Sequence, residues 1–236
     1  MLKIKNLSKS YGDKKAVDNL NIEIKAGEIY GFIGHNGAGK TTTLKSVVGI
    51  LDFEEGEIYI DGISIKDNPL EAKKRIAYIP DNPDIYNYMT GIKFLEFIAD
   101  IYEVGDERKE RIEKYATMLG IKNALGDLIG NYSHGMKQKL VIVSALIHNP
   151  KLIIMDEPFV GLDPMAAHEL KETMREVCNA GGAIFFSTHV LDVAEKLCDK
   201  VAIIKGGKLI KSGTMEEVKG DASLESAFLE LEEGHA

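Results

Sequence analysis

The sequence predicts an α/β fold in which a mostly parallel β-sheet is interrupted by an inserted helical lobe. Short segments rich in isoleucine and valine alternate with helical segments towards both ends of the chain. The run KLIIMDE at 151–157 is apolar until it ends in two acids, as expected for a strand buried on both faces of a parallel sheet. Between these regions, from about Thr90 to Leu146, apolar residues recur at helical spacing.

The first part of the chain predicts mainly strands. Strands are expected at 2–9, 20–25 and 28–33, because each run is short, rich in isoleucine and bounded by Gly, Asn or Asp. A helix at 40–49 and two further strands near 57–60 and 76–79 should follow.

The middle of the chain predicts three helices. Phe94, Phe97, Ile98 and Ile101 recur at helical spacing and therefore lie on one face of the first. Two more helices fit residues 107–119 and 135–147. This part is interpreted as a helical lobe inserted into an α/β domain.

Alternation of strands and helices returns at Lys151. After the strand at 151–157, Asp163 and Pro164 supply an N-cap and a proline at the first helical position. A strand at 182–188, a helix from about Val190 and a strand at 200–205 follow. Thr214 and Glu217 have the spacing of a capping box at a last helix start.

The composition limits the classes of protein to which the chain can belong. The net charge is −8, which argues against nucleic-acid binding because such proteins normally carry a basic surface. No apolar run reaches the roughly 18 residues that span a bilayer, and the N-terminus lacks the apolar core of a signal peptide. The chain is therefore expected in the cytosol unless a partner holds it to a membrane. Cys178 and Cys198 are interpreted as reduced thiols.

Residues 34–41, GHNGAGKT, match the phosphate-binding pattern GxxxxGK[ST]. The match follows the predicted strand EIYGFI and opens the helix KTTTLKSVVG, which is the context that the motif requires. Glycines let several backbone N–H groups point at one spot, and the helix start adds partial positive charge there. We expect ATP to bind here, with Lys40 on the β and γ phosphates and Thr41 on Mg²⁺. The predicted nucleotide-binding residues of this segment are Gly34, His35, Asn36, Gly37, Ala38, Gly39, Lys40, Thr41 and Thr42.

Two carboxylates end the buried strand at 151–157. Ligands bind at the carboxyl ends of parallel strands, so Asp156 and Glu157 should lie beside the phosphate loop. Asp156 can hold the Mg²⁺ shell, and Glu157 can orient and deprotonate an attacking water.

Several further segments together resemble the ABC (ATP-binding cassette) ATPase family over nearly the whole chain. Residues 132–139, YSHGMKQK, resemble the family signature LSGGQ, and Gly161-Leu162-Asp163 resembles the loop after the catalytic glutamate. The remaining matches are Ser187-Thr188-His189 to the switch-histidine segment, Tyr11 to the aromatic that stacks on adenine, and Val17 to the small apolar residue beside the base.

The resemblance implies a P-loop NTPase core with an N-terminal antiparallel β subdomain and an inserted α-helical subdomain. The expected α/β core comprises residues 1–84 and 148–236, and the helical signature subdomain 85–147. The family works as head-to-tail dimers that sandwich two ATP molecules, so Ser133 and Gly135 are expected to face the ATP held by a second ATPase chain. His189 and Lys40 are expected to act with Glu157 in hydrolysis.

Two departures from the family pattern stand out. Tyr132, His134 and Met136 replace the usual signature Leu, Gly and Gln, and His134 is bulkier than glycine. Asp81 stands where the family usually has glutamine, in the loop that joins the core to the helical lobe. We predict that Asp81 lies near Mg²⁺; a turn-capping Asp81 that faces solvent is the alternative.

The resemblance further implies that the chain powers a separate transmembrane permease and lies on the inner face of the cell membrane through it. The loop containing Asp81, the short helical lobe and the signature segment look most like ATPases of bacterial exporters of the peptide-antibiotic and Ecs types, with binding-protein-dependent importers next. A soluble ABC ATPase of an assembly system, such as the iron–sulfur scaffold type, remains the alternative. Ribosome-associated types usually carry two cassettes in one chain.

Overall fold

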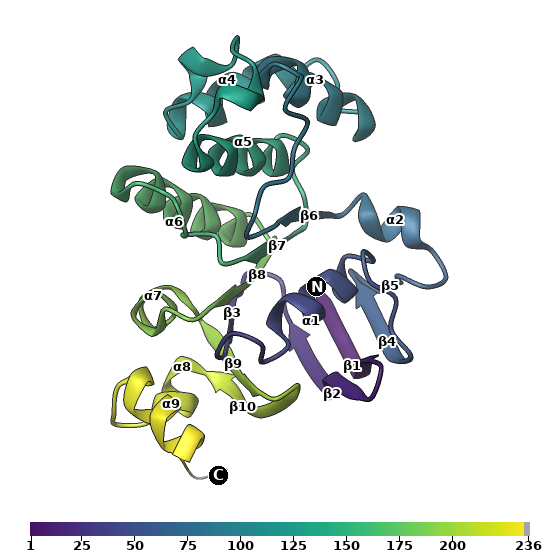
Figure 1. The fold of residues 1–236 in the computed structure, drawn as a ribbon, viewed down its shortest axis with the longest axis vertical. Helices are drawn as coiled ribbons and strands as arrows, with labels where there is room; N and C mark the ends of the chain where they lie inside the picture. Colours follow the sequence, from purple (N-terminus) through teal and green to yellow (C-terminus); the bar gives the residue numbers. More distant parts are fainter. Residues whose placement is uncertain (234–236) are drawn as a thin grey trace.

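The computed structural model describes residues 1–233, in which the strands form two sheets (Figure 1). The first sheet is antiparallel and has the strand order β2-β1-β4-β5. Its strands are β1 (Leu2–Tyr11), β2 (Lys14–Ile24), β4 (Glu55–Ile60) and β5 (Ile63–Ser64). The predicted antiparallel β region at the N-terminus is confirmed.

The second sheet has the order β10-β9-β3-β8-β7-β6 and is parallel except for β10. Its strands are β3 (Ile29–Ile33), β6 (Ile76–Ile79), β7 (Leu152–Asp156), β8 (Ala183–Thr188), β9 (Lys200–Lys205) and β10 (Lys208–Thr214). All five residues of β3 and of β7 are buried, which explains their continuous apolar character. The predicted α/β fold with a mostly parallel sheet is confirmed.

The hairpin of β1 and β2 is longer than the sequence indicates. The strand predicted from residue 20 begins at Lys14, because β1 turns over Gly12 and Asp13 and the chain pairs again at once. The pairing shifts register several times, and Asn19 adopts a positive φ of 53°. Residues 14–19 are mostly polar and contain no isoleucine, so the isoleucine-rich pattern used for the prediction does not detect this part of β2.

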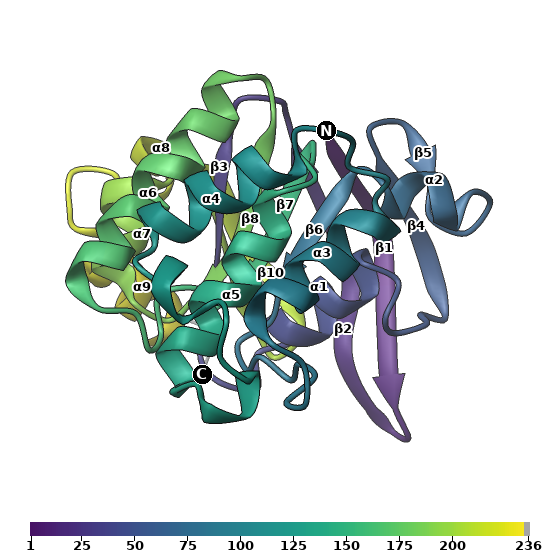
Figure 2. The ribbon, with the colours of Figure 1, turned by 90° about the horizontal axis from the view of Figure 1, so that it is seen from above.

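The helices cover the second sheet and extend beyond it (Figures 1 and 2). They are α1 (Lys40–Val47), α2 (Pro69–Lys73), α3 (Gly91–Ile101), α4 (Arg108–Met118), α5 (His134–Leu146), α6 (Pro164–Asn179), α7 (Leu191–Leu197), α8 (Met215–Lys219) and α9 (Leu224–Glu233). The predicted caps are present. Asp163 accepts from the Ala166 N–H at the start of α6, and Thr214 and Glu217 form the capping box of α8.

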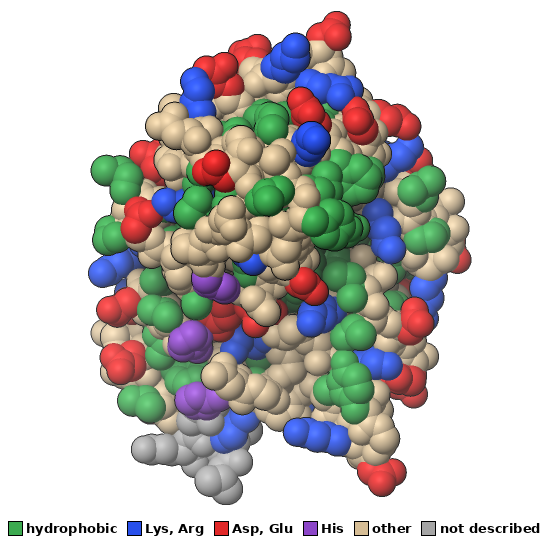
Figure 3. Space-filling view, turned by 45° about the horizontal axis from the view of Figure 1, so that its top comes forward, with side chains coloured by type: hydrophobic (Ala, Val, Ile, Leu, Met, Phe, Trp, Pro, Cys, Tyr) green, Lys and Arg blue, Asp and Glu red, His purple; other side chains and the backbone are tan. Residues whose placement is uncertain are grey.

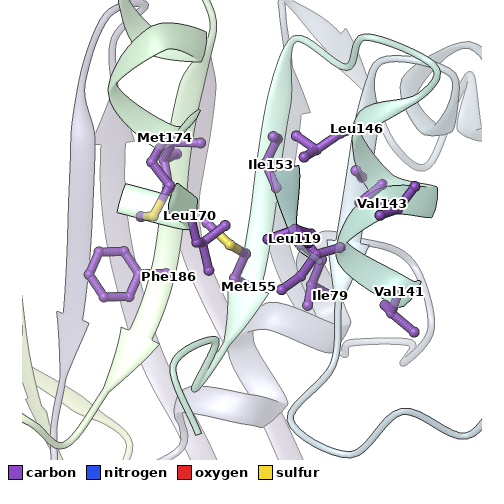
Figure 4. Packing of buried hydrophobic residues seen from close by; sticks show 14 of the residues in the cluster. Ile79, Leu119, Val141, Val143, Leu146, Ile153, Met155, Leu170, Met174 and Phe186 are labelled. Atoms are coloured by element: carbon purple, nitrogen blue, oxygen red, sulfur yellow. The ribbon is translucent and has the colours of Figure 1, made fainter. Parts of the chain in front are cut away.

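Two hydrophobic clusters lie on opposite faces of the parallel sheet. One cluster joins α1 to the face that carries Phe32, Ile154 and Phe185 and continues into the antiparallel sheet. The other joins α5 and α6 to the face that carries Met155 and Phe186. In Figure 4, Leu170 and Met174 of α6 lie on one side of Ile153 and Met155 of β7, and Leu146 and Val143 of α5 lie on the other. The core therefore fixes the carboxyl ends of β3, β7 and β8 from both sides.

The helical region of α3, α4 and α5 lies at the top of Figure 1, above the sheet. On α3, Phe94 and Leu95 are buried, but Phe97 and Ile101 of the predicted apolar face are exposed, by 41% and 55%. The helix therefore has two apolar stripes, of which only one packs inside the protein. No helix within residues 1–233 is long and apolar enough to cross a membrane.

Candidate active site

The loop between β3 and α1 and the first turn of α1 carry the predicted phosphate-binding residues. The Lys40 side chain is buried, and its Nζ donates to the Gly34 carbonyl at 2.6 Å and to the His35 carbonyl at 3.3 Å. The first N–H groups of α1 have no intrahelical acceptors, so they are available to an anion. Burial lowers the pKa of Lys40, and the carboxylates of Glu157 and Asp156 oppose that shift. The loop and the lysine together form a cationic cradle.

Three backbone segments meet directly behind this loop. Gly39 adopts a φ of 109°, and a side-chain Cβ there would lie 2.4 Å from the Ala16 carbonyl oxygen. A Cβ at Gly207 would lie 2.8 Å from the same oxygen, so both positions require glycine. The Gly207 N–H donates to the Ala38 carbonyl, and the Asp18 N–H donates to the Gly207 carbonyl, each at 2.9 Å. The turn between β9 and β10 thus anchors the phosphate loop to β2.

Asp156 ends β7 and is fully buried. Its Oδ1 accepts a 2.5 Å hydrogen bond from the Ser187 Oγ on the neighbouring strand β8. Its Oδ2 is buried without a hydrogen-bond partner in the described part of the chain. Since a buried carboxylate oxygen normally has a partner, Asp156 Oδ2 points to a ligand or a water at this position.

Glu157 follows at the tip of the same strand with a positive φ of 47°. This conformation is uncommon outside glycine, and it directs the side chain away from the course of the strand. The Glu157 N–H donates to the Ser187 Oγ at 3.1 Å, which holds the bend. Glu157 Oε1 lies 2.9 Å from His189 Nδ1 and 3.7 Å from Lys40 Nζ. The predicted acid, histidine and lysine therefore meet at one point, although they come from three elements.

A cleft of about 380 Å³ opens over these groups. Figure 3 shows histidines along one side of this face, next to recessed acidic and basic side chains. The cleft is lined by the predicted residues Tyr11, His35, Asn36, Gly37, Gly39, Lys40, Thr41, Thr42, Asp81, Asp156 and Glu157. It is also lined by Lys14, Lys15, Ala16, Gly206 and Gly207, which the sequence analysis did not identify.

Some predicted residues lie beside the cleft and not on its wall. The Val17 side chain is buried in the hydrophobic core, and its neighbour Ala16 lines the cleft instead. Tyr11, by contrast, does line the cleft and is 52% exposed. Gly34 reaches the site through its carbonyl group, and Ala38 is buried beneath the loop. His189 touches Glu157 and is half exposed.

The donors at the cleft fit a magnesium ion. Thr41 and Asp81 line the cleft together with Asp156, whose Oδ2 is the buried, unpartnered oxygen. Hydroxyl and carboxylate oxygens are the hard ligands that Mg²⁺ prefers. Asp81 is exposed, and its Oδ1 also accepts from the Asn82 N–H at 2.8 Å. Asp81 therefore both caps the turn before Pro83 and faces the cleft.

The two predicted signature residues do not line this cleft. Ser133 caps α5 by accepting from the Met136 N–H at 3.3 Å and is exposed. A Cβ at Gly135 would lie 2.6 Å from the Gly161 carbonyl oxygen, so the helix start packs tightly on the segment after Glu157. Lys139 adds an ion pair of 2.5 Å to Asp163 in that segment. The chain thus has a second exposed helix start that packs on the segment following Glu157 but does not line the cleft with the phosphate loop.

Comparisons with known proteins agree with this geometry. The model of the family described as "ABC transporter" matches residues 17–160. The chain is 38% identical over 220 residues to the bacitracin transport ATP-binding protein BcrA of Bacillus licheniformis, covering 93% of this chain and 71% of BcrA. It is 34% identical to the ABC-type transporter ATP-binding protein EcsA of Bacillus subtilis, covering 98% and 96% of the two chains.

Solved structures with the same fold include an ATP-binding subunit of an ABC transporter. It superposes with a TM-score of 0.95 at 34% identity and covers 98% of this chain and 99% of its own. The cassette MJ0796, solved as a dimer in a post-hydrolysis state bound to ADP and phosphate, gives a TM-score of 0.82 at 26% identity. That alignment covers 91% of this chain and 99% of MJ0796.

Proposed function

The chain belongs to the ABC transporter family as an ATP-binding subunit that hydrolyses ATP to ADP and phosphate, and on that premise we propose that it drives a separate membrane permease, in an exporter. We assign residues 1–84 and 148–236 to the nucleotide-binding core, of which 234–236 lie outside the described residues, and 85–147 to the helical signature subdomain. The names of two relatives, a bacitracin transport protein and a linearmycin resistance protein of Bacillus subtilis, support the exporter assignment.

The separation of the two anion-binding helix starts carries this proposal. The phosphate loop, Asp156, Glu157 and His189 converge within one chain, but Ser133 and Gly135 lie outside the cleft. A second chain, placed head to tail, supplies its own Ser133 and the free N–H groups behind it to the γ-phosphate. The dimeric structure of MJ0796 supports such a pairing in this family. The second chain is either identical or a related ATPase.

In the closed site we assign each group one role. Lys40 and the loop N–H groups hold the β and γ phosphates, Tyr11 stacks on adenine, and Glu157 takes the proton of the attacking water. Thr41, Asp81 and Asp156 would hold Mg²⁺, which would neutralise phosphate charge there. His189, which touches Glu157, stabilises charge on the γ-phosphate.

An exposed apolar patch in the helical region supports docking to a permease. Tyr86 contacts Tyr88 and Phe97, with ring centroids 5.8 and 6.2 Å apart, and all three are exposed. Ile101 and Leu128 of the same region are also exposed. Figure 3 shows hydrophobic side chains gathered on this face of the molecule. A contiguous apolar patch marks an interaction site, and here the partner is the cytoplasmic surface of a permease, which keeps the chain on the inner face of the cell membrane.

Co-purification tests the permease assignment. We expect the chain, produced together with the multi-spanning membrane protein of a neighbouring gene, to be retained with that protein after extraction from membranes. Tyr88→Asp should abolish retention, because it places a charge in the apolar patch, and Tyr59→Asp on the antiparallel sheet serves as a control. Both variants should hydrolyse ATP alone as the wild type does. If Tyr88→Asp and Tyr59→Asp are retained with the membrane protein to the same extent, docking through this patch is contradicted. A wild-type chain that never associates with membranes favours a soluble assembly ATPase.

The substitution Asp81→Asn tests the metal assignment. The amide keeps the size and the hydrogen bond to the Asn82 N–H but removes the charge. We expect the Mg²⁺ concentration for half-maximal hydrolysis to rise by about tenfold, a loss typical of residues that act on a metal through its ligands or waters. ATP affinity in EDTA should increase, because one negative charge near the phosphates is gone. Asp84→Asn, in the same loop, is the control. If both titrations of Asp81→Asn overlay the wild type, Asp81 only caps the turn.

A further inference from the structure

Two buried polar atoms near the carboxyl end of β7 have no partner among the described residues. One is Oδ2 of Asp156, and the other is the phenol oxygen of Tyr78 on the neighbouring strand β6. A buried polar atom without a partner is destabilising, so two such atoms on neighbouring strands require an explanation. The Tyr78 hydroxyl plays no part in the site described above.

The strand register places the two side chains on the same face of the sheet. Tyr78 pairs with Ile154 in the parallel ladder of β6 and β7, and paired residues of parallel strands share a face. Asp156 follows Ile154 by two positions and therefore lies on that face, one pleat nearer the cleft. On the other side, Ser187 pairs with Asp156 and donates to its Oδ1. The carboxylate is thus held from β8 but not directly from β6.

The surroundings keep the phenol protonated. Burial raises the pKa of Tyr78, and the carboxylates of Asp156 and Asp81 raise it further. The strand register places Asp156 and Tyr78 on one face of neighbouring strands, although neither Asp156 nor Asp81 accepts a hydrogen bond from the hydroxyl. A buried donor and a buried acceptor on the same face of neighbouring strands, neither with a protein partner, are groups that a buried water can join.

We propose that Tyr78 is a positioning residue for Asp156, its hydroxyl donating to one buried water that donates in turn to Asp156 Oδ2. The inference rests on the proposed function, in which Asp156 helps to hold Mg²⁺. Ser187 then fixes Asp156 Oδ1, and Tyr78, through the water, fixes Asp156 Oδ2, whose second lone pair remains for Mg²⁺. Asp81 lies three residues after Tyr78, in the loop that leads into the helical region. The water-mediated contact of Tyr78 therefore also connects the Asp156 carboxylate to that loop.

The test is Tyr78→Phe, which removes only the hydroxyl, with Tyr30→Phe as a matched control. Tyr30 on β3 lies on the same face of the sheet as Tyr78, since Tyr30 pairs with Phe185, Phe185 with Ile154, and Ile154 with Tyr78. The Tyr30 hydroxyl, however, interacts with Ser212 and not with Asp156. Binding of a fluorescent ATP analogue is measured as a function of Mg²⁺ and again in EDTA, without hydrolysis. We expect Tyr78→Phe to raise the half-saturating Mg²⁺ concentration about tenfold, as for other groups that orient metal ligands, and to leave metal-free binding unchanged.

A double-mutant cycle with Ser187→Ala separates positioning from general damage. If both hydroxyls act through Asp156, their effects on the half-saturating Mg²⁺ concentration should not be independent. The fold-change in the combined variant should then differ from the product of the two single fold-changes. A Tyr78→Phe titration that overlays Tyr30→Phe overturns the proposal, as does an equal loss of binding with and without metal. A wild-type chain whose ATP binding is insensitive to Mg²⁺ contradicts the proposed metal function itself, which is a distinct outcome.

Discussion

Glu157→Gln is expected to lower steady-state ATP hydrolysis by about 10²–10⁴-fold while ATP binding is retained, since loss of a general base has effects of this size. The amide keeps the shape of the side chain at the tip of β7 and its place beside His189, but it cannot take a proton from water. Uncleaved ATP should then hold two chains together. Light scattering with ATP and Mg²⁺ should give twice the mass of the monomer.

Glu172→Gln, on the exposed surface of α6, provides the control, because it makes the same chemical change away from the cleft. The control should turn over ATP normally and should not accumulate as a dimer. Near-normal hydrolysis by Glu157→Gln, or a strictly monomeric variant at saturating ATP, would remove Glu157 from the role of general base.

Ser133→Arg is expected to lower hydrolysis by about 10²–10³-fold, comparable to the loss of an anion-stabilising donor, and to prevent the ATP-dependent dimer. Arginine is too bulky for the start of α5 to approach a triphosphate held by the other chain. Within its own chain, Ser133 is exposed and does not line the cleft, so ATP should bind to the monomer as tightly as in the wild type. Combining Ser133→Arg with Glu157→Gln should abolish the trapped dimer.

Thr117→Arg on the exposed side of α4 adds the same charge to the same helical region and serves as the control. It should dimerise and hydrolyse ATP like the wild type. A loss of ATP affinity by monomeric Ser133→Arg is the result that contradicts an intermolecular position for Ser133.

The sequence predicted those parts of the fold that depend on local pattern. β6 at Ile76–Ile79 coincides with its predicted range, and the helix starts at Asp163 and Thr214 have the predicted caps, because burial on both faces and cap chemistry are local properties. The start of β2 was predicted incorrectly, and the predicted apolar face of α3 is only partly buried. A polar hairpin with register shifts has no clear alternation, and α3 has apolar residues on two sides.

The same distinction holds for the site. The phosphate loop is contiguous, and the carboxylates end a strand, so both were recognisable before the structure. Ala16 and Gly207 support the loop because the turn after β9 contacts β2. That contact joins residues far apart in the sequence, so no local sequence pattern predicts it. Tyr78 was read as part of a strand, since the meaning of its hydroxyl depends on the register of β6 against β7.

The position of β3 between β8 and β9 has a consequence for biosynthesis. Ile29 pairs with Ile184 and Tyr30 with Lys200, so the strand that leads into the phosphate loop acquires its neighbours only when the last quarter of the chain has left the ribosome. Until then, the apolar segment IYGFI has two unpaired edges and is open to association with other nascent chains. Contacts between residues so distant in sequence also form slowly. A nascent chain that stops before β9 would contain the complete phosphate-binding motif without a folded site to support it.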